Sequence, residues 1–183
     1  GSGIIHSEMP AMKGGKLLGF QLWINMPAKL KKNKPSYSFL NPDQIGIYQD
    51  KEKIVKIIAG KYKNVEGPEK GHNVEPLYFH IKLNKDKNFS TDVPLGHNSF
   101  IYLLEGELKI GSQKHNKTKN SNLILLDKGN SLKIEAIRNS EFLVIAGKPI
   151  NEPIARGGPF VMNTKQEILQ AIQDYHNGTF AKY

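Results

Sequence analysis

Short runs of apolar residues, some of them alternating with polar ones, fill the middle of the chain. They predict β-strands over residues 54–59, 77–83, 100–104, 107–110, 123–126, 132–134 and 142–146. In one of them Phe79, Ile81 and Leu83 share a face, as the two-residue period of a strand requires. Glu105-Gly106 lies between two of the runs and predicts a β-hairpin. Short strands at this spacing, without helices between them, indicate a β-sandwich or barrel.

The pattern changes on the N-terminal side of this series. Residues 19–25, Gly-Phe-Gln-Leu-Trp-Ile-Asn, alternate with a period of two and predict one more strand. Residues 26–43 contain three prolines and a lysine cluster, which indicates a linker. Within the series, residues 61–76 are rich in glycine, proline and charge and predict a long loop.

A helical pattern appears near the C-terminus. Thr164 and Glu167 have the T-x-x-E spacing of a capping box, in which each side chain satisfies a backbone amide near the other. The apolar stripe of the predicted helix consists of Ile168, Ala171, Ile172 and Tyr175. Asn177-Gly178 ends the helix, because glycine accepts the left-handed conformation there. We expect the helix to cover the barrel wall.

Composition restricts the partners. The chain has 183 residues, a net charge of +9 and no cysteine. Only two residues are arginine, the usual base-reading side chain, and the cluster of Lys29, Lys31, Lys32 and Lys34 is interpreted as a solvated linker, so we do not expect nucleic acid to bind. No apolar run is long enough to cross a bilayer, so no membrane segment is expected. The lack of cysteine suits a reducing compartment, and we expect a cytoplasmic protein.

Candidate chemistry is sparse. His6 and Glu8 are two residues apart and would face the same side of a strand, where an imidazole and a carboxylate can bind one metal ion. A surface pair of no function is the alternative. His97 is a spare metal candidate, although a loop-capping role is preferred. Residues 156–159, Arg-Gly-Gly-Pro, indicate a turn, with anion binding as the weaker interpretation.

Three stretches resemble the pirin family, whose members contain two cupin barrels. They are residues 3–10, Gly-Ile-Ile-His-Ser-Glu-Met-Pro; residues 19–25; and residues 152–164, Glu-Pro-Ile-Ala-Arg-Gly-Gly-Pro-Phe-Val-Met-Asn-Thr. The first also matches the latter half of the second metal motif of many cupins, Pro-x-Gly-x-x-His. The resemblance implies an all-β fold: a cupin barrel of jelly-roll type, remnant strands of a second cupin and a short C-terminal helix.

The resemblance also implies a metal site. In pirins the residues matching His6 and Glu8 are two of four protein ligands to one iron, so Fe(II) or another divalent metal is the implied cofactor. The other two ligands are histidines of a His-Pro-His-Arg-Gly segment, which this sequence does not contain. Some pirins cleave flavonols such as quercetin, which implies an iron-dependent dioxygenase with Glu8 as metal ligand or catalytic base. A non-catalytic scaffold or a transcription cofactor that binds a protein partner is the alternative.

The cupin metal motifs can be tested on the complete barrel. Anchoring the first motif on Gly106 places Ser99 at its glutamate position, and its two histidine positions fall within residues 92–95, Asp-Val-Pro-Leu. Anchoring the second motif on Gly129 places Leu132 at its histidine position. We therefore expect this barrel to bind no metal.

These observations predict a domain plan. Residues 1–33 form the last part of an N-terminal pirin cupin, 34–43 a linker, 44–150 the C-terminal cupin barrel, and 151–183 a C-terminal segment with the helix. Strands remaining from a barrel expose unpaired edges and an apolar face, including Phe20 and Trp23, that need cover. We therefore expect a homodimer or a cleaved fragment. A monomer by light scattering, without a co-purifying fragment, would count against both.

Overall fold

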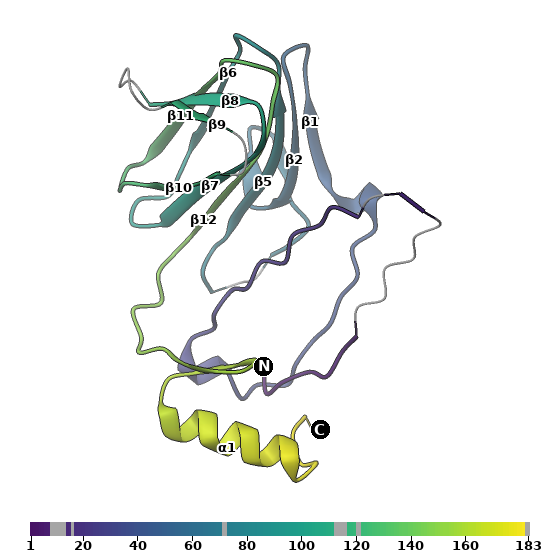
Figure 1. Cartoon of the computed structure of the whole chain (residues 1–183), viewed down its shortest axis with the longest axis vertical. Coiled ribbons are helices and arrows are strands. Elements are labelled where there is room, and N and C mark those ends of the chain that lie inside the picture. The colour runs from purple at the N-terminus through teal and green to yellow at the C-terminus, as the bar shows by residue number, and fades with distance from the viewer. Residues whose placement is uncertain (8–13, 16, 71–72, 112–116, 120–121, 182–183) are drawn as a thin grey trace. The chain divides into compact units, whose positions relative to one another are not determined.

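The chain folds into two compact units. The computed structural model describes residues 1–7, 14–15, 17–70, 73–111, 117–119 and 122–181. One unit, here the terminal unit, combines Gly1–Ser38 with Ile150–Tyr183; the other, the barrel unit, is Phe39–Pro149 (Figure 1). The terminal unit is therefore built from both ends of the sequence, whereas the barrel unit is one continuous stretch.

The larger sheet of the barrel unit has six antiparallel strands in the order β1-β2-β5-β12-β7-β10. Its strands are β1 (Gly46–Gln49), β2 (Lys53–Ala59), β5 (Leu77–Leu83), β7 (Asn98–Glu105), β10 (Asn122–Leu126) and β12 (Ser140–Gly147). Buried and less buried positions alternate along β5 as the sequence predicted. A short 3-10 turn, η2 (Pro42–Gln44), precedes β1.

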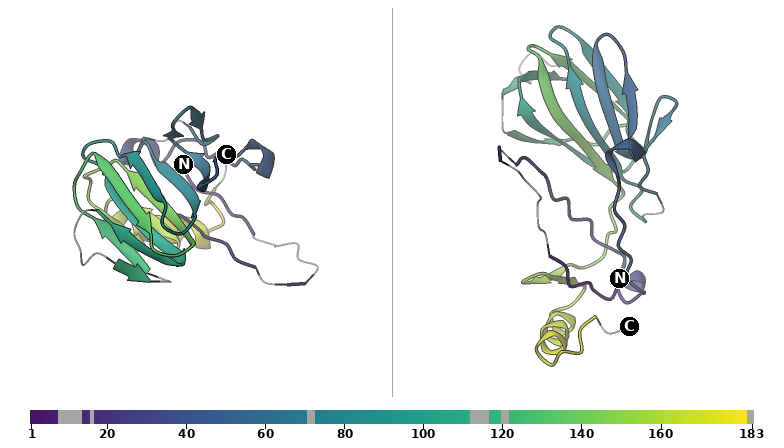
Figure 2. Two further views of the ribbon diagram at one scale, coloured as in Figure 1. Left: turned by 90° about the horizontal axis from the view of Figure 1, so that it is seen from above. Right: turned by 90° about the vertical axis from the view of Figure 1, so that its right-hand side faces the viewer.

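The second sheet has four strands in the order β6-β11-β8-β9. They are β6 (Asn88–Asp92), β8 (Glu107–Ile110), β9 (Lys117–Lys119) and β11 (Ser131–Ala136). The two sheets face each other in Figures 1 and 2 and enclose one apolar core. This arrangement confirms the predicted all-β barrel.

Aromatic rings form the centre of that core. Phe89 of β6 is fully enclosed, stacks on Tyr62 at 5.3 Å between ring centroids and meets Phe142 of β12 edge-on at 6.1 Å. Phe79 of β5 lies edge-on to Tyr62 at 6.0 Å. Such pairs stabilise the fold beyond the burial of their area, and they join the two sheets.

The predicted hairpin at Glu105-Gly106 is wrong. Strands β7 and β8 do flank this dipeptide, but β7 pairs with β10 and β12, whereas β8 pairs with β9 and β11. The chain passes from one sheet to the other at Gly106, which has φ 102° and no space for a side chain because Ser140 lies against it. A strand–Gly–strand pattern is the same for a hairpin and for such a corner, so the sequence could not separate them.

The predicted loop over residues 61–76 contains a small ladder. Strands β3 (Lys61–Tyr62) and β4 (Val65–Glu66) pair antiparallel. Tyr62 is buried in the core, which explains why this polar segment is ordered against the barrel. A single buried aromatic in a charged stretch gives no periodic signal, and the sequence pattern therefore missed it.

The terminal unit contains a hairpin and a helix. Strands β13 (Ala155–Gly157) and β14 (Phe160–Met162) pair across the predicted turn, and α1 (Lys165–His176) packs on this hairpin. The helix was expected to cover the barrel wall; its contacts within the terminal unit are to the hairpin. Ile168 is its buried residue, and a Cβ at Gly157 would contact the Ile168 side chain, so the close approach of α1 requires glycine there.

Both predicted ends of α1 are confirmed. The Thr164 hydroxyl accepts a hydrogen bond from the Glu167 amide at 3.2 Å, and the Glu167 carboxylate accepts one from the Thr164 amide at 2.9 Å. Gly178 follows the helix with φ 66°. Among the described residues, no helix has the length and apolar character that a bilayer crossing requires.

The N-terminal part of the terminal unit contains η1 (Ala28–Leu30), a 3-10 turn. Residues 17–27, which include the strand predicted at 19–25, are not assigned to a strand. Trp23 is half exposed, and Phe20 is similar. Alternation fixes which side chains share a face, but a strand also needs a neighbour in register to accept its hydrogen bonds.

Candidate functional site

The first candidate metal ligand lies beside a cavity. His6 is exposed and lines a cavity of about 730 Å³ in the terminal unit. Its segment, residues 1–7, is not assigned to a strand. Glu8, the second candidate ligand and proposed catalytic base, lies outside the described residues, so its position relative to His6 stays a prediction.

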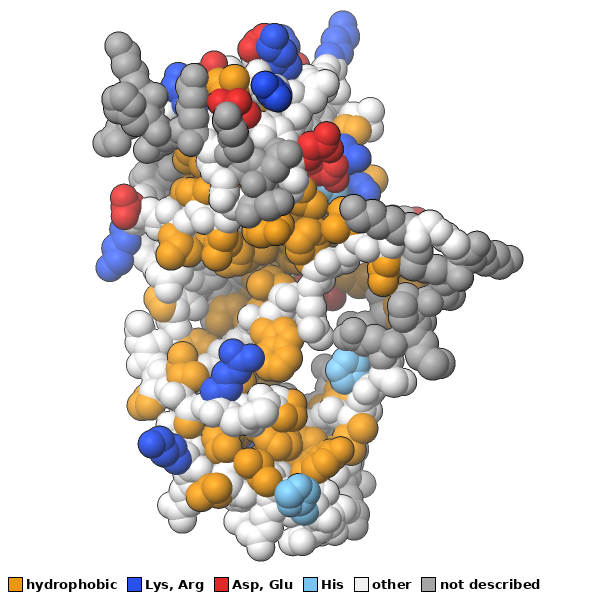
Figure 3. Space-filling view, viewed as in Figure 1, with side chains coloured by type: hydrophobic (Ala, Val, Ile, Leu, Met, Phe, Trp, Pro, Cys, Tyr) orange, Lys and Arg blue, Asp and Glu red, His pale blue; other side chains and the backbone are white. Residues whose placement is uncertain are grey.

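Aromatic rings form one wall of this cavity. Phe160 of β14 meets Phe180 edge-on at 5.3 Å, and Tyr175 of α1 lies 6.4 Å from Phe160 and 6.2 Å from Phe180. Gly3 lies against the Phe180 ring so closely that a Cβ would overlap it. Trp23 lines the cavity as well. In Figure 3 apolar side chains gather around this part of the terminal unit. The cavity thus offers flat, apolar surface next to an imidazole.

The carboxylates that line the cavity form hydrogen bonds within α1 and at its N-terminal end. The Glu167 carboxylate accepts hydrogen bonds from the Thr164 hydroxyl at 3.0 Å and from the Asn163 and Thr164 amides. These bonds, the one from the Thr164 hydroxyl first, lower the pKa of Glu167 below its usual value. Asp174 accepts from the Gln170 amide group at 2.8 Å. Both groups are therefore used to hold the helix.

A metal ion needs more protein ligands than the described residues of this cavity provide. Within the part of the chain that the structure describes, no three His, Cys, Asp or Glu side chains are grouped as metal ligands. A single imidazole from His6 leaves most of the coordination sphere to water, and metal affinity depends on the full ligand set. The described residues alone therefore do not fit the metal centre that the resemblance implies.

The barrel unit has a cavity of its own. This cavity has a volume of about 560 Å³ and lies between the two sheets. Its lining includes Val93, Ser99, Ile124, Leu126 and Leu132. Ser99 and Leu132, which the cupin motifs place at metal-ligand positions, both line this cavity. Ser99 contributes a hydroxyl group and Leu132 an isobutyl group, so these two positions give the cavity a mixed polar and apolar wall in place of imidazole or carboxylate ligands.

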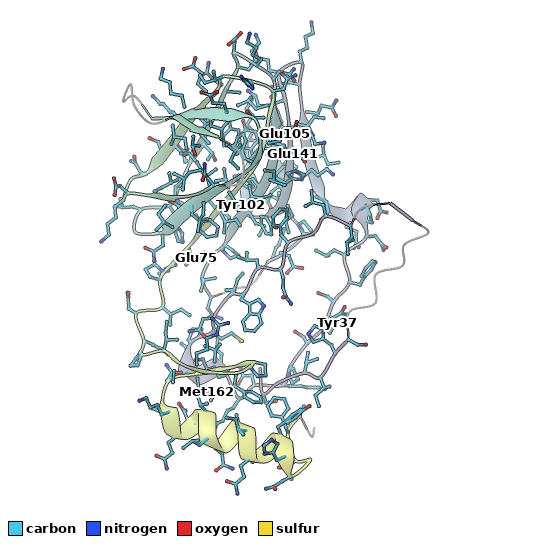
Figure 4. The ribbon with its side chains drawn as sticks, in the orientation of Figure 1. Tyr37, Glu75, Tyr102, Glu105, Glu141 and Met162 are labelled. Carbon is cyan, nitrogen blue, oxygen red and sulfur yellow. The ribbon has the colours of Figure 1, made fainter. Side chains whose placement is uncertain are left out.

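The other histidines that the structure describes are His80, His97 and His176. His80 of β5 lies on the polar face, as predicted, and its Nε2 is 2.6 Å from a carboxylate oxygen of Glu141. Glu141 belongs to β12 and is labelled in Figure 4. His97 is buried, and within the described part of the chain neither ring nitrogen has a hydrogen-bond partner; its backbone amide donates to the Pro94 carbonyl. His176 is the last residue of α1, where a cation is favoured. His72 and His115 lie outside the described residues.

One residue was misjudged from the sequence. Lys31 was interpreted as part of a solvated cluster, yet its side chain is buried, with a relative exposure of 7%, and its Nζ donates to the Asn163 side-chain carbonyl at 2.9 Å. Nothing in the local sequence distinguishes it from exposed Lys32 and Lys34. Its burial comes from the C-terminal segment, far away along the chain.

Comparison with known proteins places the fold in context. Residues 78–181 match the family model of the pirin C-terminal cupin domain. The chain is 35% identical to a pirin-like protein of Caulobacter vibrioides over 98% of its own length, and 35% identical to human pirin over 97%. It spans 65% and 61% of these two curated relatives, that is, less than two thirds of their length.

Solved structures agree with this relationship. The fold superposes on a quercetin 2,3-dioxygenase of Acinetobacter baumannii with a TM-score of 0.79 and 32% identity, covering 87% of this chain and 56% of that one. The family match covers more than half of the chain, and the relatives match it almost from end to end. The chain belongs to the pirin family.

Proposed function

We propose that this chain contributes to a pirin-type dioxygenase of the quercetinase class, in which His6 and Glu8 are ligands of one divalent metal ion. The observation that carries the proposal is the position of His6 on a large cavity with an aromatic wall, in a chain 32% identical to a quercetin 2,3-dioxygenase over most of its length. A planar flavonol would pack against such a wall.

The remaining metal ligands would come from another polypeptide segment or subunit. Zinc and iron sites that catalyse reactions use three or more protein ligands and keep a position open for substrate. His6 and Glu8 supply two. When bound, the metal would act as a Lewis acid toward the oxygens of the substrate. The chain's own part is to present the two ligands and the apolar wall.

Metal analysis tests the proposal directly. The purified chain is loaded with Fe(II), and its metal content and affinity are measured beside the variants His6→Ala, Glu8→Ala and, as matched control, His176→Ala. We expect weak binding that both ligand variants abolish and the control retains. Adding a pirin fragment that carries the His-Pro-His segment should raise the affinity and allow quercetin consumption with O₂.

Two results would overturn the proposal. One is metal binding that is unchanged in His6→Ala and Glu8→Ala, since the ion would then bind elsewhere. The other is no metal binding even with the added fragment, which would leave the alternative, a non-catalytic pirin-like scaffold that binds a protein partner.

A further inference from the structure

The buried ammonium of Lys31 has no charged partner among the residues that the structure describes. Its side chain is 7% exposed, and the Asn163 carbonyl oxygen at 2.9 Å is its hydrogen-bond acceptor. Among the described residues no carboxylate forms an ion pair with it. An ammonium has three donors, and a buried charge is costly unless it is paired. A buried lysine usually has a carboxylate partner, and none is found here among the described residues.

The Glu152 carboxylate is linked to Lys31 only through Asn163. Asn163 donates its Nδ2 to Glu152 at 2.8 Å while its Oδ1 faces Lys31, so its amide separates the cation from the anion. The same Glu152 oxygen accepts the Ala28 amide at 2.8 Å. These bonds fix the orientation of Asn163 and hold Lys31 in place without neutralising it locally. Such a fixed, partly desolvated cation favours an external anion.

Lys31 lines a second cavity of about 330 Å³ in the terminal unit. Arg156 lines it too, with its guanidinium 5.4 Å from the centroid of the Trp23 ring, within the range of a cation–π contact. Much of the remaining wall is apolar and includes Met26 and Met162, the latter on β14 (Figure 4). The cavity thus combines the side-chain cations of Lys31 and Arg156 with aromatic and thioether surface.

We propose that this cavity binds a small aromatic carboxylate. The carboxylate accepts hydrogen bonds from the Lys31 ammonium and the Arg156 guanidinium, which are the two cationic side chains of the wall. The ring packs against Trp23 and the methionines, whose polarizable sulfurs suit aromatic partners. The volume is at the small end of ligand pockets, which favours a single-ring ligand over a larger one. Lys31 and Trp23 line both cavities, but His6 lines only the larger one, so a His6 variant separates this inference from the metal function.

Benzoate is the probe, and Trp23 is the reporter, because it is the one tryptophan of the chain. Benzoate is titrated into the whole chain while the fluorescence is followed, and calorimetry gives a second reading. We expect saturable binding, with benzamide and acetate at least about tenfold weaker because each lacks either the charge or the ring. Loss of one charge-assisted contact in Lys31→Met should weaken benzoate about tenfold or more.

Two controls accompany that variant. Lys34→Met removes an equivalent, exposed lysine from the same segment and should leave the benzoate affinity unchanged. His6→Ala, which disables the proposed metal function, should also leave it unchanged. Failure of one proposal is thereby distinguished from failure of the other.

Arg156→Gln keeps the experiment decisive if Lys31→Met does not fold, since Arg156 is exposed and its loss does not open the core. This variant should weaken benzoate about three- to tenfold, as loss of a partly solvated charge contact would. The proposal is overturned if benzoate shows no saturable binding, if benzamide binds equally well, or if neither Lys31→Met nor Arg156→Gln changes the affinity.

Discussion

The barrel unit buries the apolar side chains of its alternating strands, whereas the terminal unit leaves many of its apolar side chains exposed. In β5, alternating side chains are buried because β2 and β12 pair on either side and a second sheet covers the inner face. Residues 19–25 alternate in a similar way, yet Phe20, Trp23 and Ile24 are 42–54% exposed. The comparison teaches that alternation specifies a face, whereas neighbouring strands in register make that face a core.

The largest expected effect is on the aromatic centre of the barrel. Phe89→Ala removes a fully buried ring that contacts Tyr62 and Phe142, and it should lower the free energy of unfolding by about 3–5 kcal/mol. Urea unfolding followed by circular dichroism measures the change. Phe39→Ala, at a position 73% exposed, is the matched control and should cost well under 1 kcal/mol, or roughly the effect of a surface substitution. Equal losses in both variants would show that the barrel core is not organised around these rings.

The next effect concerns the corner where the chain changes sheets. Gly106→Ala places a Cβ at φ 102° and against Ser140, and should destabilise the barrel by roughly 1–3 kcal/mol. Gly129→Ala is the control, because its surroundings are open and its φ is not in the left-handed region. Thermal unfolding of the two variants measures the difference. A Gly106→Ala protein as stable as the control would contradict the corner described here.

A smaller effect is expected in the terminal unit. Thr164→Ala removes the N-cap acceptor for the Glu167 amide and should destabilise α1 by about 1 kcal/mol. Hydrogen exchange of the α1 amides measures this locally, without interference from the barrel. Thr164→Ser keeps the hydroxyl and should behave almost as the parent chain. Faster exchange in the barrel as well would mean that the two units unfold together.

The smallest effect is a pH dependence of the same cap. The pKa of Glu167 is lowered by its hydrogen bonds to Thr164, so its ionised form stabilises the folded state. That contribution is fully present above the usual value of 4.5 and is lost as pH falls through the lowered pKa. Protection of α1 should therefore differ between the parent and Glu167→Gln at pH 6, and the difference should shrink toward pH 3. A constant difference would show that the carboxylate charge is not involved.

The parts of the fold that the sequence predicted are those with local signals. The strand at 77–83 follows from side-chain period, the strand at 142–146 from a short apolar run, and both ends of α1 from capping residues; the structure confirms all of them. The sheet change at Gly106 and the burial of Tyr62 were missed because both depend on residues distant in sequence. A local pattern does not record which strand becomes the neighbour.

The candidate site was predictable to a smaller extent. The motif around His6 indicated a ligand, and the structure places this residue on a cavity whose aromatic wall comes mainly from residues 160–180. The burial of Lys31 depends on Asn163, far away along the chain, and on contacts that no periodicity reveals. Its neighbours Lys32 and Lys34 look the same in sequence and are exposed. A site shared by two ends of a chain becomes visible only when the chain is folded.

The composition of the terminal unit from both ends of the chain sets an order of assembly during synthesis. A ribosome completes the barrel unit before it reaches residues 150–183, so the barrel can fold while the chain is still being made. The bonds from Ala28 to Glu152 and from Lys31 to Asn163 join residues 1–38 to this last segment, so they form only after the barrel segment has been made. The hairpin and α1 are therefore the elements whose synthesis completes the terminal unit.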